Sequence, residues 1–150
     1  MIGSYLDEWN IVTITVRLIL AVVCGGAIGL TRSVKRRGAG FKTHALVCLG
    51  SALVMMTGQY IYVDFGAISD IARLAAQVIS GVGFLGVGTI MVTRDNHVKG
   101  LTTAAGLWTC AGIGLSIGIG FYSGAAITTI LVLVIYRFMG RVDEIAYEHS

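Results

Sequence analysis

The sequence contains no proline and few charged residues. Only 13% of its 150 residues are Asp, Glu, Lys or Arg, against roughly 25% in soluble domains. Hydrophobic residues make up 55% of the chain, and the mean hydropathy is +0.82. This composition excludes an ordinary soluble domain and predicts a membrane protein. Without proline, a helix break must come from one of the 21 glycines or from unpaired backbone.

Cysteine is also scarce, and the sequence contains no recognisable combination of catalytic residues. Cys24, Cys48 and Cys110 lie in apolar runs without C-x-x-C spacing, which favours small buried side chains over a disulfide or metal role. The sequence has no paired carboxylate, His-rich motif or nucleophile beside a base. We therefore expect no enzyme, no cofactor and no metal site. The net charge of +3, without a basic face carrying aromatic residues, does not indicate nucleic-acid binding.

Long runs without charge predict an all-α polytopic membrane protein. Residues 101–136 contain no charged residue and would extend roughly 54 Å as one helix, against a hydrocarbon core of about 30 Å. This run must fold back, and its glycine-rich stretch at 118–124 suits a tight turn. We predict a single domain over residues 1–150 with five transmembrane helices, at about 11–30, 45–62, 74–92, 101–118 and 122–138.

Lys and Arg are concentrated on one side of this predicted topology. Nine of them fall in the connections 31–43 and 93–100 and in the C-terminal tail, whereas the opposite connections carry only Arg73. Because cytoplasmic loops are enriched in these residues, we predict an outside N-terminus and a cytoplasmic C-terminus.

A glycine-rich run within the third predicted helix resembles a nucleotide-binding fingerprint. Gly81, Gly83 and Gly86 spell G-x-G-x-x-G, but the run 74–93 is uncharged and the first acid after it is Asp95. The fingerprint requires a strand before it and an acid about 20 residues later. Two interpretations remain: glycines for close helix packing, or an irregular segment whose carbonyl groups bind an ion.

Small residues at four-residue spacing predict further close helix contacts. Gly25 and Gly29 have this spacing in the first helix, and Gly106, Gly114 and Gly118 follow it in the fourth. Residues four apart share one helix face, and small faces let helix backbones approach in lipid.

One arginine lies inside the first predicted helix and needs a partner or access to the surface. Arg17 is about six residues from the helix start, and the third helix begins on the same side of the membrane. Asp70, Arg73 and Gln77 follow one another at three- and four-residue steps there. We predict a polar outer-leaflet cluster of these four residues, which serves either as a satisfied packing network or as the mouth of a polar site.

Three segments of the chain resemble the MgtC/SapB family of bacterial inner-membrane proteins over residues 11–138. They are GLTR at 29–32 with AGFKTHALV at 39–47, RLAAQVISGVGFLG at 73–86, and KGLTTAAGLW at 99–108. The signature residues are Arg32, Thr43, His44, Gly81, Gly83, Gly86, Gly100, Thr102, Thr103 and Trp108. Thr31 stands where the family usually has Glu, and Ile71-Ala72 separates Asp70 from Arg73 where the family often has Asp-Pro before the Arg.

The resemblance implies a five-helix domain in the bacterial cytoplasmic membrane without the soluble C-terminal domain of MgtC itself. It links the chain to magnesium homeostasis and virulence. It also implies contact with the membrane part of the F-type ATP synthase rather than magnesium transport. We therefore expect a non-enzymatic regulator that acts by helix contact. The alternative is a small ion or solute transporter or channel, and we expect a homo-oligomer in either case.

Overall fold

The computed structural model describes the backbone of residues 9–34, 38–65 and 70–147. Five helices lie in these ranges, which confirms the predicted all-α class and helix number. They are α2 (Ile11–Val34), α3 (Phe41–Phe65), α4 (Ile71–Val87), α5 (Leu101–Ile119) and α6 (Tyr122–Tyr147). A short hairpin of β1 (Met91–Val92) and β2 (Val98–Lys99) joins α4 to α5.

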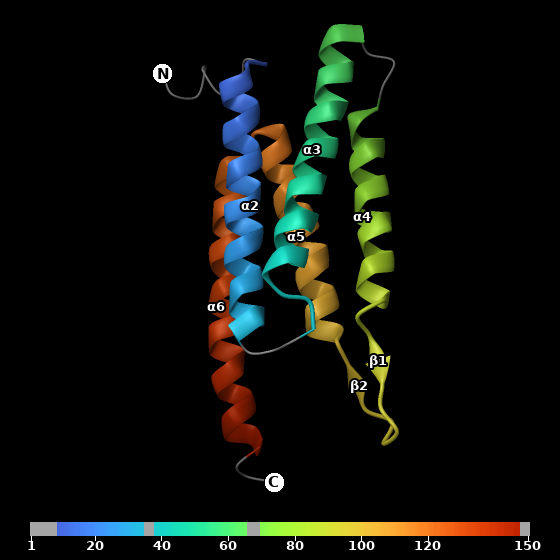
Figure 1. Cartoon of the computed structure of the whole chain (residues 1–150), viewed down its shortest axis with the longest axis vertical. Coiled ribbons are helices and arrows are strands. Elements are labelled where there is room, and N and C mark those ends of the chain that lie inside the picture. Colours follow the sequence, from blue (N-terminus) through green and yellow to red (C-terminus); the bar gives the residue numbers. More distant parts are fainter. Residues whose placement is uncertain (1–8, 35–37, 66–69, 148–150) are drawn as a thin grey trace.

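The five helices run up and down, side by side (Figure 1). We call the end where α2 begins and α5 turns into α6 the amino-terminal end. The end where α3 and α5 begin and the β-hairpin lies is the hairpin end. Helices α2, α3, α5 and α6 pack around one another, while α4 contacts α3 and α5 at the edge of the bundle.

Local side-chain and glycine chemistry sets several helix boundaries. Asn10 Oδ1 accepts a hydrogen bond from the Thr13 amide at 2.8 Å, and Asp70 Oδ1 accepts one from the Ala72 amide at 3.0 Å. Both carboxamide and carboxylate oxygens satisfy amides that a helix start leaves free. At the predicted turn, Gly120 has a φ of 88° and ends α5 in the left-handed conformation that glycine adopts without strain.

The third helix is shorter than predicted, and the hairpin after it was not predicted. Helix α4 ends at Val87 rather than near residue 92, and Met91 pairs with Lys99 across an antiparallel ladder. The turn contains Asn96 with a φ of 59°, a conformation that asparagine tolerates. The prediction was wrong here because a lack of charge continues through the first strand, and charge content does not distinguish a strand from a helix.

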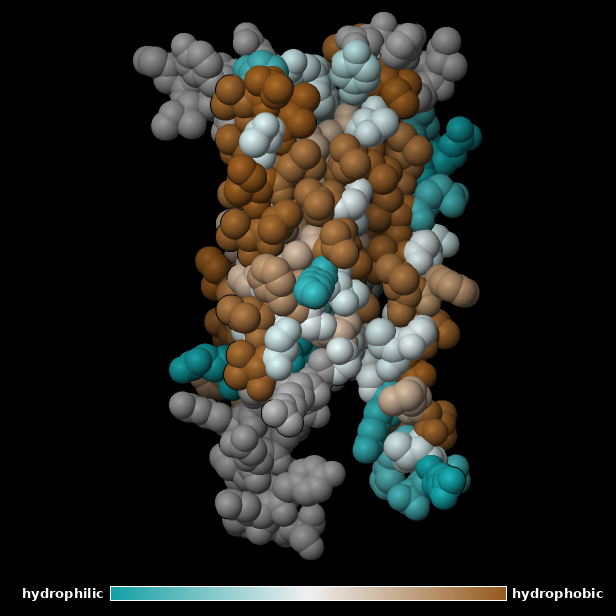
Figure 2. Space-filling model, in the orientation of Figure 1, coloured by the Kyte–Doolittle hydropathy of each residue, from teal (hydrophilic) through white to brown (hydrophobic). Residues whose placement is uncertain are grey.

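Within the part of the chain that the structure describes, three helices are long and apolar enough to cross a membrane by themselves, namely α2, α3 over Phe41–Val63, and α5. Helix α4 and the stretch Tyr122–Phe138 of α6 are shorter apolar helices. The visible surface of the bundle is mostly hydrophobic along the helices, with polar groups at the outer edge of α4, around the β-hairpin and at a few isolated positions (Figure 2). An apolar outer surface on long apolar helices is that of a membrane protein.

Small side chains fill much of the centre of the bundle. The main buried cluster consists of Ala21, Ile28, Cys48, Ala52, Cys110, Ile113, Ile117 and Ala125. We call it the apolar layer. The three cysteines are free thiols, and Cys48 and Cys110 occupy the layer as small apolar groups.

Candidate functional site

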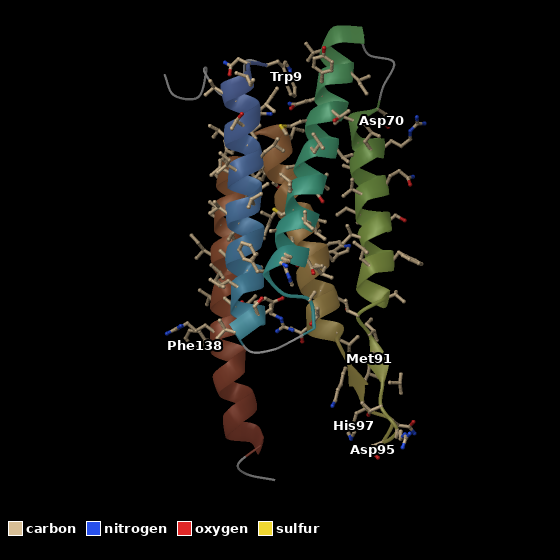
Figure 3. All side chains as sticks on the ribbon, viewed as in Figure 1. Trp9, Asp70, Met91, Asp95, His97 and Phe138 are labelled. Carbon is tan, nitrogen blue, oxygen red and sulfur yellow. The ribbon has the colours of Figure 1, made fainter. Side chains whose placement is uncertain are left out.

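Arg17 is buried near the amino-terminal end and hydrogen-bonds to three other helices. Only 4% of the residue is exposed. Its Nε donates to the Tyr122 hydroxyl at 2.9 Å, and its Nη1 donates to Gln59 Oε1 at 3.2 Å and to the Gly118 carbonyl at 2.8 Å. We call these four residues the Arg17 cluster. The guanidinium also lies 5.7 Å from the ring centroid of Trp9, which Figure 3 places at the same end of the bundle.

A second arginine joins the helices at the hairpin end. Arg32 Nη2 donates to Thr103 Oγ1 at 2.8 Å, and its guanidinium carbon lies 4.9 Å from the centroid of the Tyr136 ring. The flat guanidinium group suits both contacts, because it donates in fixed directions and stacks on aromatic faces. We call Arg32, His44, Thr103 and Tyr136 the Arg32 cluster.

His44 is the most enclosed member of the Arg32 cluster, with 0% of the residue exposed. Its Nδ1 lies 2.9 Å from the Gly40 carbonyl, so Nδ1 is assigned as the donor and Nε2 carries the lone pair. No group among the described residues hydrogen-bonds to Nε2. A Cβ added to Gly106 would lie 3.3 Å from this nitrogen and would overlap the Tyr136 hydroxyl. Gly106 therefore allows the tyrosine to reach the histidine side of the cluster.

The two clusters are built from the same four helices and lie on either side of the apolar layer. Helices α2, α3, α5 and α6 each supply one group to each cluster. Arg17 and Arg32 are fifteen residues apart on α2, which corresponds to about 22 Å along the helix axis. Ser51 and Thr129 are also buried in this part of the bundle, and each hydroxyl donates to a carbonyl of its own helix.

The structure does not bring the predicted outer-leaflet cluster together. Arg17 bonds to α3, α5 and α6, whereas Asp70, Arg73 and Gln77 lie on α4, on the far side of α3 (Figures 1 and 3). Asp70 caps α4 through the Ala72 and Arg73 amides. Arg73 and Gln77 are exposed. Figure 2 shows polar groups along the outer edge of α4. The four residues share one end of the bundle but not one site.

Five glycines at four-residue spacing lie where helices touch. An added Cβ would lie 2.6 Å from the His44 carbonyl at Gly25 and 2.7 Å from the Gly40 carbonyl at Gly29. At Gly118 it would lie 2.6 Å from the Ala52 carbonyl, and at Gly114 it would overlap the Cys48 carbonyl. These glycines and Gly106 face neighbouring helices of the same chain. They are thus not a free surface for a partner.

The glycine run of α4 is helical, so the irregular ion-binding segment considered above is not observed. Gly86 packs against Ala104, with 3.4 Å from an added Cβ to the alanine Cβ. Gly81 and Gly83 face open space, with no atom within 4 Å of an added Cβ. The run therefore serves internal packing at one position and leaves two positions open.

The other signature residues lie near the hairpin end of the bundle. Gly100 has a φ of 97° beside the Thr89 carbonyl, so a side chain there would be strained. The Thr102 carbonyl lies 3.4 Å from the Tyr136 hydroxyl. Thr43 is exposed on the first turn of α3, and Trp108 is 52% exposed on α5. The basic residues Lys35, Arg36 and Arg37 lie outside the described residues.

Sequence reasoning missed Gln59 and Tyr122 as partners of Arg17, and Tyr136 as a partner of Arg32. Gln59 carried a usable signal, since an amide inside an apolar run requires a partner in a membrane. The two tyrosines carried none, because aromatic residues near helix ends are also common as interface anchors. Within the described residues no group of three or more His, Cys, Asp and Glu gathers to hold a metal ion.

Comparison with known proteins identifies one family. The model of the MgtC family matches residues 18–145, which includes the Arg32 cluster, the apolar layer and the three partners of Arg17. No solved structure gives a significant match.

Curated relatives include proteins from several bacteria. YhiD of Escherichia coli strain K12, named as a candidate magnesium transporter, is 47% identical over 60% of this chain and 43% of its own length. An uncharacterized protein of Haemophilus influenzae is 39% identical over 89% of this chain and 58% of its own length. Protein MgtC of Brucella abortus is 39% identical over 77% of this chain and 46% of its own length. The chain thus spans about half the length of these relatives.

Proposed function

Because the chain belongs to the MgtC family, we propose that it is a non-enzymatic regulator of another membrane complex in magnesium homeostasis. Its place is the bacterial cytoplasmic membrane, and its activity matters under magnesium limitation and during growth in a host. The name of the YhiD relative supports the link to magnesium. This chain regulates another membrane complex rather than transporting magnesium itself.

Five spans with an outside N-terminus fit the distribution of charge. At the hairpin end the described residues include Arg32, Lys42, Arg94 and Lys99, whereas Arg73 lies at the start of α4. Positive residues are enriched in cytoplasmic loops, so the hairpin end is the cytoplasmic end. Helix α4, with 17 residues, is about 26 Å long, close to the hydrocarbon thickness of about 30 Å.

The observation that carries the proposal is the apolar layer between the two polar clusters. Ions cross membranes along polar groups or water-filled cavities. Each described helix of the four-helix core has buried Ala, Ile or Cys between its two cluster residues. Such a layer offers ions no polar path through the centre of the bundle. It therefore favours a bundle of fixed shape that acts through its outer surface.

The proposed partner is the membrane part of the F-type ATP synthase. The contact surface is the outer face of the bundle, because the α5 glycine stripe is already covered by α3 and Tyr136 of the same chain. An apolar surface with small and aromatic groups packs against other membrane helices without a need for charge pairs. A homo-oligomer presents two or more such surfaces.

Proteoliposome flux separates regulation from the second candidate function, a small transporter. The purified chain is reconstituted into liposomes, and Mg²⁺, K⁺, H⁺ and phosphate are tested in turn, each with an enclosed indicator for that ion. We expect no flux above that of empty liposomes. Flux of any of these ions that saturates with concentration would replace regulation by transport and would place the path between copies or along the lipid-facing surface.

A proton-pumping assay tests the regulatory step directly. Inverted membrane vesicles that contain the ATP synthase acidify when ATP is added, and the purified chain is fused into them. We expect slower acidification and a lower final proton gradient than with a fused control membrane protein. Equal acidification at all ratios of chain to ATP synthase would rule out this partner.

A further inference from the structure

A groove of about 550 Å³ runs between α3 and α4 on the outside of the bundle. Its lining is largely aliphatic, with Val47 and Val82 among the lining residues. These two valines pack on Leu107 and Ala111 of α5, which supports the base of the groove. The volume falls within the range of small-molecule sites, roughly 300–1,000 Å³.

The groove exists because two facing helices carry glycine where they pass each other. Gly50 of α3 and Gly81 of α4 both line it, and neither has an atom within 4 Å of an added Cβ. Toward the amino-terminal end the same helices are in contact, where an added Cβ on Gly58 would lie 2.9 Å from Leu74 Cδ1. The groove is therefore closed at that end and extends toward the hairpin end.

Two of the three polar residues that line the groove lie at one end. Lys42 and Thr43 line it from the first turn of α3, and both are exposed. The third polar residue, Ser51, donates its hydroxyl to the Val47 carbonyl of its own helix. Val54 is twelve residues after Lys42 on the α3 wall, which corresponds to about 18 Å along the helix axis. The result is an aliphatic groove with a cation and a hydroxyl at its hairpin end.

We propose that this groove binds an anionic phospholipid, with an acyl chain along the aliphatic wall between Gly50 and Gly81 and the phosphate at Lys42 and Thr43. An ammonium group beside a membrane attracts anionic headgroups. The arrangement of charge at one end and aliphatic surface along the rest matches the chemistry of a phospholipid. This inference does not depend on the proposed regulatory function.

The size of the groove favours a lipid chain over a transmembrane helix of a partner. A helix with its side chains is about 10 Å across, so 18 Å of it would occupy roughly 1,400 Å³. This exceeds the volume of about 550 Å³ between α3 and α4. An acyl chain is narrower and needs no hydrogen bonds from the wall.

Native mass spectrometry of the full chain, released from nanodiscs of equal phosphatidylglycerol and phosphatidylcholine, tests the proposal. We expect one retained lipid per chain with phosphatidylglycerol preferred. Gly81→Leu and Gly50→Leu each fill the groove and should abolish retention. Lys42→Gln should keep retention but lower the preference by about fivefold, equivalent to roughly 1 kcal/mol for one cation near the surface.

Gly83→Leu is the matched control, because Gly83 is also open and helical on α4 but does not line the groove. It should retain lipid as the native chain does. Glycerol phosphate alone should not compete, which distinguishes a lipid from a free phosphate. Native retention in Gly81→Leu, or equal loss in Gly83→Leu, would overturn the proposal. The proposal would also be overturned if the native chain forms a dimer without retained lipid and Gly81→Leu converts that dimer to a monomer. The groove would then bind a second copy of the chain.

Discussion

At the scale of single residues, the buried arginine of α2 near the amino-terminal end joins that helix to α3, α5 and α6 by hydrogen bonds. Arg17 uses its side-chain donors on a hydroxyl, an amide oxygen and a main-chain carbonyl. A charged group inside a membrane is expensive unless such partners are present. Its burial therefore makes the Arg17 cluster a determinant of helix arrangement rather than a surface feature.

Loss of one Arg17 contact should weaken the bundle measurably. Tyr122→Phe removes the hydroxyl that accepts from Nε, and we expect it to lower the free energy of unfolding by about 1.5–3 kcal/mol, the usual value for a hydrogen bond to a charged group. Arg17→Lys should lose more, because an ammonium group cannot reproduce the planar set of donors. Unfolding by SDS in mixed micelles, followed by circular dichroism, measures both.

Tyr62→Phe is the control for this series, since Tyr62 is 46% exposed on α3. Its hydroxyl removal should leave the unfolding curve unchanged. An unchanged stability in Tyr122→Phe would show that the tyrosine hydroxyl contributes no net stability to the Arg17 cluster.

At the scale of elements, helix α5 illustrates how glycines of one helix differ in role. Gly114 lies against the Cys48 carbonyl of α3, while Gly112 has no atom within 4 Å of an added Cβ. Both were equally visible in the sequence. The four-residue spacing selected Gly114 and passed over Gly112, so periodicity alone distinguished the packed position from the open one.

The two glycines should respond in opposite directions to the same substitution. Gly114→Ala forces the Cys48 carbonyl away and should destabilise the bundle by about 1–3 kcal/mol, as overpacking does. Gly112→Ala should raise stability by up to about 1 kcal/mol through better helix propensity. The SDS unfolding midpoint of each variant measures the effect, and a stable Gly114→Ala would contradict the tight α3–α5 contact.

The third helix shows where element prediction from this sequence ends. It begins at Ile71, three residues before the predicted start at 74, because the Asp70 side chain caps it there. Its end at Val87 and the hairpin that follows could not be predicted, because the strand pairing of Met91 with Lys99 depends on residues eight apart. The uncharged run masked the change from helix to strand.

At the scale of the whole molecule, four helices form a core with a polar cluster near each end, and α4 lies at the edge. Only Val82 and Gly86 are buried in α4, whereas nine residues are buried in α5. Helix α4 thus leaves most of its surface open to lipid and to other proteins. This places the groove between α3 and α4 at the boundary between the core and its outer helix.

The proposed orientation predicts which ends of the bundle are reached from outside the cell. In a chain with Cys24, Cys48 and Cys110 changed to Ala, a single cysteine is introduced at Ser123 or at Asn96, both exposed in the structure. A membrane-impermeant maleimide should label Ser123→Cys in intact cells and Asn96→Cys only in inverted vesicles, because Lys and Arg gather at the hairpin end. The reverse pattern would contradict the outside N-terminus.

The sequence by itself determined the membrane class, the five helices, the turn near Gly120 and the glycine contacts of α2 and α5, because hydropathy and residue spacing are properties of the chain alone. Only the tertiary structure decided the partners of the two arginines. Arg17 meets Tyr122 across 105 positions and Arg32 meets Thr103 across 71, and contacts between such distant residues depend on how the helices are arranged. The same arrangement leaves Gly81 open beside Gly50, which no spacing within one helix specifies.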